Sequence, residues 1–162
     1  MILVGLGSSL PFLGQPPEDL VRRAIEALGR LGRLERASSL YRSPAWPNES
    51  DPPFVNAAAA VSVDLGPKAL LAALNGIEAG FGRRQGRRNA PRTLDLDLLD
   101  FDGRIWMRTP KSLLELPHPR LSDRDFVLAP LAEIAPEWRH PVSGATARAL
   151  LSRLSAVRAR PI

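Results

Sequence analysis

Two aspartates, Asp95 and Asp97, stand two residues apart in the apolar stretch TLDLDLLDF. Their apolar neighbours predict a buried β-strand, although aspartate is depleted in strands. An unpaired buried carboxylate is costly, so the pair requires a counter-charge or a metal ion. Residues i and i+2 of a strand point to the same face, so both carboxylates should project side by side. Leu94, Leu96 and Leu98 should then fill the opposite, core face.

The carboxylate spacing suits Mg²⁺, a hard ion that prefers oxygen ligands and usually shares them with substrate phosphates. Two such ions can hold a transferring phosphoryl group between its attacking and leaving oxygens. The alternative is that both aspartates lie on an exposed sheet face beside arginines. Asp100 and Asp102 continue the pattern towards the turn at Gly103, where acidic residues are common, and we interpret these two as structural.

Five arginines precede the carboxylates within residues 83–92. The forked guanidinium group suits phosphate oxygens better than a lysine does. Taken singly, each of these arginines is explained more simply as a solvated surface charge. As a cluster beside two carboxylates, they favour a phosphate-binding site.

Composition limits the classes of protein that remain. The chain of 162 residues is 44% apolar and 24% charged, as in a globular protein, and its length fits one domain over residues 1–162. It has no cysteine, which excludes disulfides, thiolate zinc sites and thiol catalysis. The net charge of +5 favours anionic partners such as nucleotides, nucleic acid or phosphorylated metabolites. The N-terminus lacks a basic leader and no run reaches the roughly 18 apolar residues of a membrane helix, so we expect a cytoplasmic protein without membrane contacts.

The elements that must position these residues follow from hydrophobic periodicity. Strands are predicted at 2–6, 34–43, 54–65 and 93–101, and helices at 18–31, 67 to 80 or 82, and roughly 145–155. This order predicts an α+β fold of the ferredoxin-like (βαββαβ) type, with an antiparallel sheet, helices on one face and a C-terminal extension. No heptad pattern or long apolar edge is visible, so a monomer is expected.

The motif PRTLDLDLLDFDG resembles the signature of the 6-hydroxymethyl-7,8-dihydropterin pyrophosphokinase family. Five further blocks match the family in order and spacing, and together they cover nearly the whole chain. They are GLGSSL at 5–10, SLYRSPAW at 39–46, PPFVNAA at 52–58, IEAGFGR at 77–83 and LPHPRLSDRDFVLAPLAEIAP at 116–136.

The resemblance implies a ferredoxin-like fold and a reaction of folate biosynthesis. The β,γ-pyrophosphoryl group of ATP would pass to the hydroxymethyl oxygen of the pterin, with release of AMP. Two Mg²⁺ ions would bridge the ATP phosphates and the pterin hydroxyl. Such transfers need alignment and charge neutralisation and little covalent work by the protein, which agrees with the lack of a convincing nucleophile. The residues implied in catalysis are Asp95, Asp97, Arg83 and Arg92, the two aspartates being the metal ligands.

The resemblance also implies two sets of binding residues. For ATP, it implies contacts from Asn75, Glu78, Arg84, Arg88, Arg92, Leu98, His118 and Arg124, and it leaves Arg120 open. For the pterin, it implies contacts from Ser43, Pro44, Ala45, Trp46, Phe54, Asn56 and Phe126. A flat ring can stack between two phenylalanines, and an asparagine amide offers a donor and an acceptor to the pterin edge. Without the resemblance, core packing would be the simpler explanation of either phenylalanine, and a structural role would be the simpler explanation of His118.

The match departs from the family at three positions. Ser9 stands where the family usually has asparagine, and Asn89 and Ala90 stand where it commonly has an aromatic residue followed by glycine. In the family that aromatic residue closes over the substrates, so one alternative is a relative that binds nucleotide or pterin with altered or lost catalysis. Another is a basic module that binds single-stranded nucleic acid. Only 6% of the residues are aromatic, and the two carboxylates would repel a phosphate backbone. We therefore expect no nucleic-acid partner.

Overall fold

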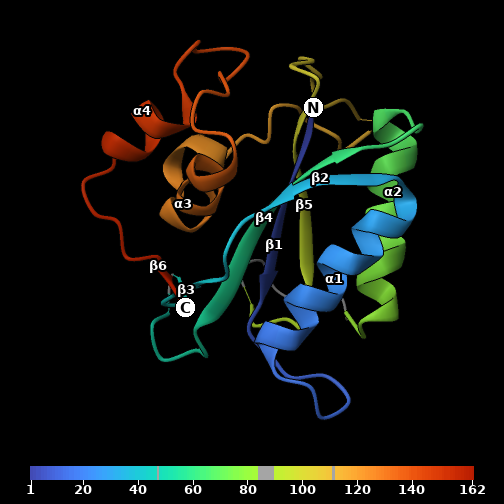
Figure 1. Ribbon diagram of the computed structural model, residues 1–162, viewed down its shortest axis with the longest axis vertical. Helices are drawn as coiled ribbons and strands as arrows, with labels where there is room; N and C mark the ends of the chain where they lie inside the picture. Colours follow the sequence, from blue (N-terminus) through green and yellow to red (C-terminus); the bar gives the residue numbers. More distant parts are fainter. Residues whose placement is uncertain (47, 84–89, 111) are drawn as a thin grey trace.

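The computed structural model describes residues 1–46, 48–83, 90–110 and 112–162. Its centre is an antiparallel sheet with the strand order β5-β1-β4-β3-β6, and β2 lies off this path and pairs with β4 (Figure 1). The strands are β1 (Ile2–Ser8), β2 (Arg33–Ala37), β3 (Tyr41–Ser43), β4 (Phe54–Ser62), β5 (Asp95–Phe101) and β6 (Arg160–Pro161). The helices are α1 (Pro17–Leu31), α2 (Pro67–Gly80), α3 (Asp125–Ile134) and α4 (Ala147–Ser152), with a 3-10 turn η1 (Leu121–Asp123).

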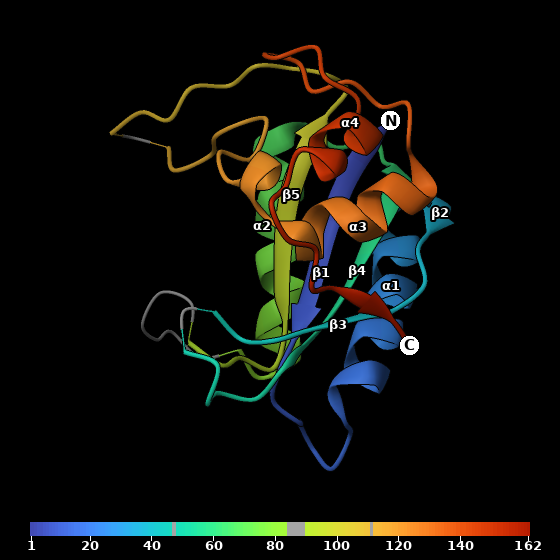
Figure 2. The same ribbon diagram turned by 90° about the vertical axis from the view of Figure 1, so that its left-hand side faces the viewer.

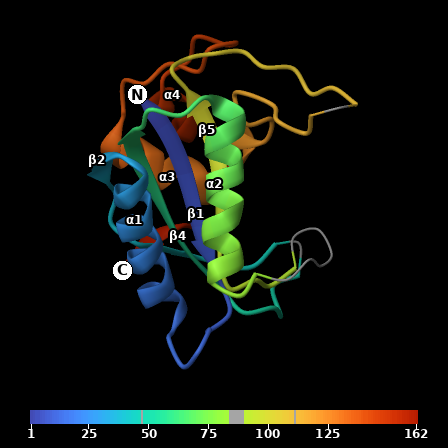
Figure 3. The same cartoon turned by 90° about the vertical axis from the view of Figure 1, so that its right-hand side faces the viewer.

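One face of the sheet is covered by α1 and α2, which lie in front of the strands in Figure 3. Val4 and Leu6 of β1 pack there with Leu28 of α1 and Leu74 of α2. Both helices begin with proline at their first turn, where the missing N–H group costs nothing. Alternate apolar residues of the central strands point to the face that α1 and α2 cover, and so fix which face it is.

The other face is covered by α3 and α4, which lie in front of the strands in Figure 2. Leu3 and Leu99 pack there against Leu128 and Leu131 of α3. Nearer the end of β1 and the start of β5, none of the helices in the described part of the chain covers this face (Figure 2). The functional residues described below line that open part.

The predicted fold class is confirmed. The helices α1 and α2 of the βαββαβ unit lie on one face, and the C-terminal extension adds η1, α3, α4 and β6. Within the described residues, no helix is long and apolar enough to cross a membrane.

The strand predicted at 34–43 is wrong in one respect, because it is two strands, β2 and β3. Ser38 causes the break by bonding to β4 through its side chain as well as its backbone. Its Oγ accepts the N–H of Ala58 at 2.9 Å and donates to the carbonyl oxygen of Ser39 at 2.7 Å. Hydroxyl side chains that bond to nearby backbone groups compete with regular strand pairing in this way. The final helix is also shorter than predicted; it begins after Thr146, whose hydroxyl caps the Ala149 N–H, and ends at Ser152.

The prediction for the carboxylate strand is confirmed. Leu94, Leu96 and Leu98 are buried in the core beneath α1 and α2. Asp95 and Asp97 point to the opposite, open face, where both line a cavity.

Candidate active site

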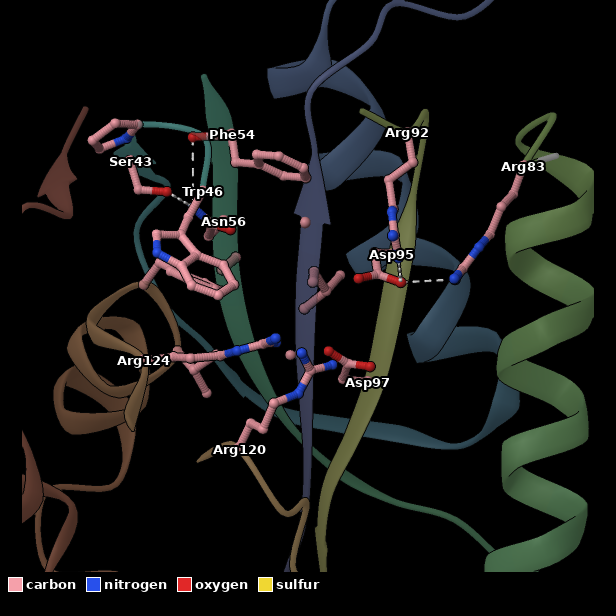
Figure 4. A pocket seen from close by; sticks show the side chains of 17 residues that line it. Ser43, Trp46, Phe54, Asn56, Arg83, Arg92, Asp95, Asp97, Arg120 and Arg124 are labelled. Atoms are coloured by element: carbon pink, nitrogen blue, oxygen red, sulfur yellow. Dashed lines mark hydrogen bonds and ion pairs between the residues drawn. The ribbon is translucent and has the colours of Figure 1, made fainter. Parts of the chain in front are cut away.

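A cavity of about 260 Å³ opens on the uncovered part of the sheet (Figure 4). Its floor comes from β1. One wall comes from β5 and the residues after α2, and the other comes from β4, α3 and the loop that follows β3. The lining residues are Gly5, Leu6, Gly7, Ser43, Pro44, Trp46, Phe54, Asn56, Ala57, Arg83, Arg92, Asp95, Asp97, Arg120, Arg124, Phe126 and Val127. All four residues predicted for catalysis and six of the seven predicted for the pterin, all but Ala45, thus line one cavity.

Glycines on β1 make the floor of this cavity. Gly7 and Gly5 pair with Asp95 and Asp97 across the two strands. A Cβ atom on Gly7 would stand 3.4 Å from Asn56 Oδ1 and 4.0 Å from Asp95 Cβ, so a side chain there would fill the space between them. Glycine inside a strand often marks a close approach of a ligand. Sequence reasoning missed this floor, although two glycines at alternate positions of a predicted strand were a usable signal.

Arg83 joins the end of α2 to the carboxylate strand. Its Nη1 lies 2.8 Å from Asp95 Oδ1, and it is also ion-paired with Glu78. Glu78 is almost fully buried, and its Oε1 accepts the N–H of Leu96 at 2.6 Å. Gly82 directs the chain back towards β5, because its φ of +71° is a conformation that favours glycine. Burial raises the pKa of Glu78 to about 7, against the opposing effects of the Leu96 N–H and Arg83.

Arg92 approaches Asp95 from the other side. Its Nη1 lies 2.9 Å from Asp95 Oδ1, so two guanidinium groups share one carboxylate oxygen (Figure 4). Ser9 holds the backbone at Arg92, since its Oγ accepts the Arg92 N–H at 3.1 Å and its N–H donates to the Arg92 carbonyl oxygen at 2.9 Å. The serine that replaces the family's usual asparagine therefore still anchors this segment.

Asp97 lies on β5, two residues beyond Asp95, and lines the cavity. About a third of its side chain (34%) is exposed. Burial raises the pKa of Asp97 to about 6, and the negative charge of Asp95 adds to the rise. A cation bound near Asp97 would lower this pKa again, because a nearby positive charge favours the ionised form of a carboxyl group.

His118 lies behind Asp97, with its Nε2 3.9 Å from Asp97 Oδ1. Burial, followed by the positive charges of Arg124 and Arg120, lowers the pKa of His118 to about 4, so the imidazole is neutral at pH 7. Its Nδ1 accepts the N–H of Arg120 at 3.3 Å, which leaves the proton on Nε2. His118 is therefore arranged to donate towards the cavity rather than to accept a proton there.

Two arginines reach the cavity from the chain segment around η1. Arg120 and Arg124 both extend towards Asp97 in Figure 4, opposite the wall that carries Arg83 and Arg92. The Arg124 guanidinium carbon also lies 5.4 Å from the ring centre of Phe126. Arg120, which the resemblance left open, thus lines the cavity together with Arg124. The carboxylates lie between two pairs of guanidinium groups.

The remaining wall is aromatic and amide in character. Asn56 is buried, and its Nδ2 donates to Ser43 Oγ at 3.0 Å and lies 3.5 Å from the Phe54 carbonyl oxygen. Phe54 and Phe126 both line the cavity, as the resemblance implied. Trp46 stands at the rim with 61% of its surface exposed. A flat ring can enter between these side chains with its edge towards the amide.

Some residues predicted for the nucleotide do not line the cavity. Asn75 is exposed on α2, and Glu78 lies behind Arg83. The Leu98 side chain is buried in the core on the other face of the sheet, and its contact with the nucleotide stays a prediction. The predictions for Arg84 and Arg88, and the departure at Asn89, lie outside the described residues.

The carboxylate pair fits a hard divalent cation in part. The two aspartates offer oxygen ligands from one strand face. Across the part of the chain that the structure describes, no group of three or more acidic, histidine or cysteine side chains could complete a metal site. Mg²⁺ is commonly held by one or two carboxylates together with substrate phosphates. The donor set therefore fits an ion that arrives with a phosphorylated substrate.

This arrangement defines a phosphoryl-transfer site, with paired carboxylates flanked by arginines on an antiparallel α+β fold. The family model described as 7,8-dihydro-6-hydroxymethylpterin-pyrophosphokinase matches residues 3–136. The chain belongs to this family.

Curated relatives agree with this assignment. A 2-amino-4-hydroxy-6-hydroxymethyldihydropteridine pyrophosphokinase of Synechocystis is 38% identical over 162 residues, which cover 99% of this chain and 79% of the relative. A protein of the same name from Pseudomonas aeruginosa is 41% identical over 142 residues, covering 86% of this chain and 83% of the relative.

Solved structures share the fold. The Plasmodium falciparum HPPK-DHPS wild type with pteroate matches 94% of this chain with a TM-score of 0.72 at 16% sequence identity. The chain spans less than half of that protein, 42% of its length. At this identity the likeness shows the fold alone.

Proposed function

We propose that the protein transfers the pyrophosphoryl group of ATP to 6-hydroxymethyl-7,8-dihydropterin and releases AMP, a step of folate biosynthesis. One observation carries the proposal. Asp95 and Asp97 line a single cavity together with four arginines and with the aromatic and amide side chains predicted for the pterin. The names of the curated relatives support the same substrate.

In this account the pterin lies between Phe54 and Phe126. The Asn56 amide, already oriented by Ser43, hydrogen-bonds the edge of the ring. The hydroxymethyl group then points from the aromatic wall towards the carboxylates. A prealigned acceptor removes much of the entropic barrier to a reaction between two substrates.

The phosphates of ATP lie against the guanidinium groups. Arg83 and Arg92 bind them from the β5 side, and Arg120 and Arg124 bind them from the α3 side. Asp95 and Asp97 are the residues that would hold Mg²⁺, two ions in the predicted arrangement. Bound Mg²⁺ supplies positive charge that neutralises the phosphate oxygens.

The reaction forms one bond and breaks another. The hydroxymethyl oxygen attacks the β-phosphorus, and the bond between that phosphorus and the α,β-bridging oxygen breaks. The bridging oxygen leaves with AMP, and the hydroxyl proton is released to solvent. No protein nucleophile is needed, because the chain's own residues align the substrates and balance charge.

A comparison of two variants tests the proposal. Wild-type protein with ATP, Mg²⁺ and the pterin should form AMP only when all three are present. Asp97→Asn keeps the shape of the side chain and removes the charge, so it should abolish AMP formation. Asp64→Asn is the matched control, since Asp64 is exposed in the turn between β4 and α2. Formation of ADP, or no turnover by folded wild-type protein, would overturn the proposal, and ligand binding without turnover would favour the catalytically altered relative.

Three further predictions belong with this proposal. Residues 1–162 act as a single domain, the protein is a monomer, and it works in the cytoplasm. The first is supported by the way α3 and α4 pack on the sheet that also carries α1 and α2.

A further inference from the structure

The C-terminal residues 153–162 lie beyond the part of the chain that the family model matches. They run from α4 past the start of α3 and end in β6, which pairs with β3 (Figure 2). Arg158, within this segment, lines a second cavity of about 310 Å³. That cavity adjoins the first, because Trp46, Arg120 and Phe126 line both.

The segment is fixed to the start of α3 through its backbone. Asp125 Oδ2 accepts the N–H of Arg158 at 2.5 Å and the N–H of Ala159 at 2.8 Å. Asp125 stands between Arg124 and Phe126, which both line the active-site cavity. These two bonds therefore attach the segment next to residues that form one side of the pterin wall.

The segment is fixed to β3 through strand pairing. Arg160 pairs with Arg42, the residue before Ser43, and the Ile162 N–H donates to the Leu40 carbonyl oxygen at 2.9 Å. Ser43 is the partner of the Asn56 amide. The C-terminal residues therefore also support the strand that orients the pterin-facing amide.

The third contact reaches the loop that carries Trp46. The Arg158 guanidinium group is ion-paired with Glu49, three residues beyond Trp46. Trp46 itself is largely exposed at the cavity rim. One side chain thus links the loop to the segment that is already fixed on α3 and β3.

We infer that Arg158 is a positioning residue for the pterin, an inference that rests on the proposed function. Its ion pair with Glu49 holds the loop after β3 against the start of α3, so Trp46 stands over the pterin site before the substrate arrives. Ordering a loop in advance lowers the cost of binding. The effect is confined to the pterin wall, because none of these contacts involves Arg83, Arg92 or the carboxylates.

The test compares Arg158→Ala with Arg148→Ala. Arg148 forms an exposed pair with Glu137 at 2.7 Å, remote from both cavities, so it controls for the loss of a surface ion pair. The backbone bonds to Asp125 remain in Arg158→Ala, so the segment stays attached. Calorimetry should show the dissociation constant of 6-hydroxymethyl-7,8-dihydropterin rising up to about fivefold in Arg158→Ala and staying unchanged in the control. KM for ATP should be unchanged in both.

Two further variants separate positioning from general stability. Arg158→Lys keeps the charge and should restore most of the pterin affinity. In a Glu49→Ala background, Arg158→Ala should have no further effect, because the pair is already broken. Pterin affinity equal to wild type in Arg158→Ala, or an equal loss for both substrates, would overturn the inference. Failure of the proposed function is a separate outcome, because the wild-type protein itself would then form no AMP.

Discussion

The two walls of the active-site cavity are held in different ways. On the β5 side, Arg83 and Arg92 share one oxygen of Asp95, and buried Glu78 supports Arg83 from behind. On the other side, Asn56 is oriented by a neutral hydrogen bond from its amide to Ser43. The first wall is an ion-pair network. The second also carries Arg120 and Arg124, but its part around Phe54, Asn56 and Phe126 is built from aromatic and neutral polar groups.

This difference fits the two substrates. A triphosphate is recognised by charge, so the arginines of an ion-pair network can exchange their carboxylate partners for phosphate oxygens. A neutral flat ring is recognised by stacking and edge hydrogen bonds, so its wall must keep its shape. Asp97 lies on β5, and Arg120 and Arg124 extend towards it from the other side of the cavity (Figure 4).

After Asp97→Asn, the largest effect is expected for Asp95→Asn, which breaks the ion-pair wall at its centre. The change removes a predicted metal ligand and leaves two guanidinium groups without their shared anion. We expect kcat to fall by about 10²–10³-fold, the usual scale for losing one group that stabilises transition-state charge. Steady-state AMP assays measure this, and circular dichroism checks that the variant is folded. A variant with wild-type kcat would show that Asp95 serves only to pair arginines.

Arg92→Ala should weaken only the nucleotide side. Loss of charge-assisted bonds to phosphate should lower kcat/KM for ATP by about 10²-fold. Arg92→Lys should recover part of this, since lysine keeps the charge but lacks the fork. Pterin affinity, measured by calorimetry without nucleotide, should remain that of the wild type. An equal loss of pterin affinity would show that the two walls are not independent.

Asn56→Ala should have the converse effect. It removes the amide that faces the pterin edge and leaves the Ser43 hydroxyl without its donor. An unmade buried hydrogen bond corresponds to a loss of roughly ten- to thirtyfold in pterin affinity. KM for ATP should be unchanged, and the same kinetic assay measures both. If KM for ATP rose in parallel, the assignment of this wall to the pterin would be wrong.

The last prediction concerns the pH dependence of stability rather than activity. The pKa of Glu78 is raised from 4.5 to about 7, so the folded protein holds a proton that the unfolded chain releases across this range. Stability contributed by this group is present below pH 4.5, is lost as pH rises to about 7 and stays lost above it. Urea unfolding of wild type and Glu78→Gln should show the free-energy difference growing in favour of the variant by up to about 3 kcal/mol between these pH values. A difference that does not vary with pH would place the Glu78 pKa near its ordinary value.

Much of the fold followed from local pattern. The alternation of Asp95 and Asp97 with leucines was enough to predict the strand and the face of each side chain, because one face is buried and a strand has a period of two residues. The break at Ser38 could not be predicted, since it depends on a hydroxyl bond to Ala58, a residue of another strand.

The site was predictable to a similar degree. Motif resemblance pointed to most of the residues lining the cavity and left Arg120 open, whereas Gly7 was missed although the alternate glycines of the first strand signalled it. Arg158 could not be predicted, because its partner Glu49 lies more than a hundred residues away in the chain. Contacts of this kind leave no periodic signal in the sequence.

The most direct test of the central claim is the fate of the β- and γ-phosphates of ATP. Phosphorus NMR and mass spectrometry of a complete reaction with Mg²⁺ and 6-hydroxymethyl-7,8-dihydropterin would follow both. We expect AMP and pterin pyrophosphate in equal amounts, with both phosphates on the pterin. ADP with a pterin monophosphate, or AMP with free pyrophosphate, would contradict the proposed pyrophosphoryl transfer.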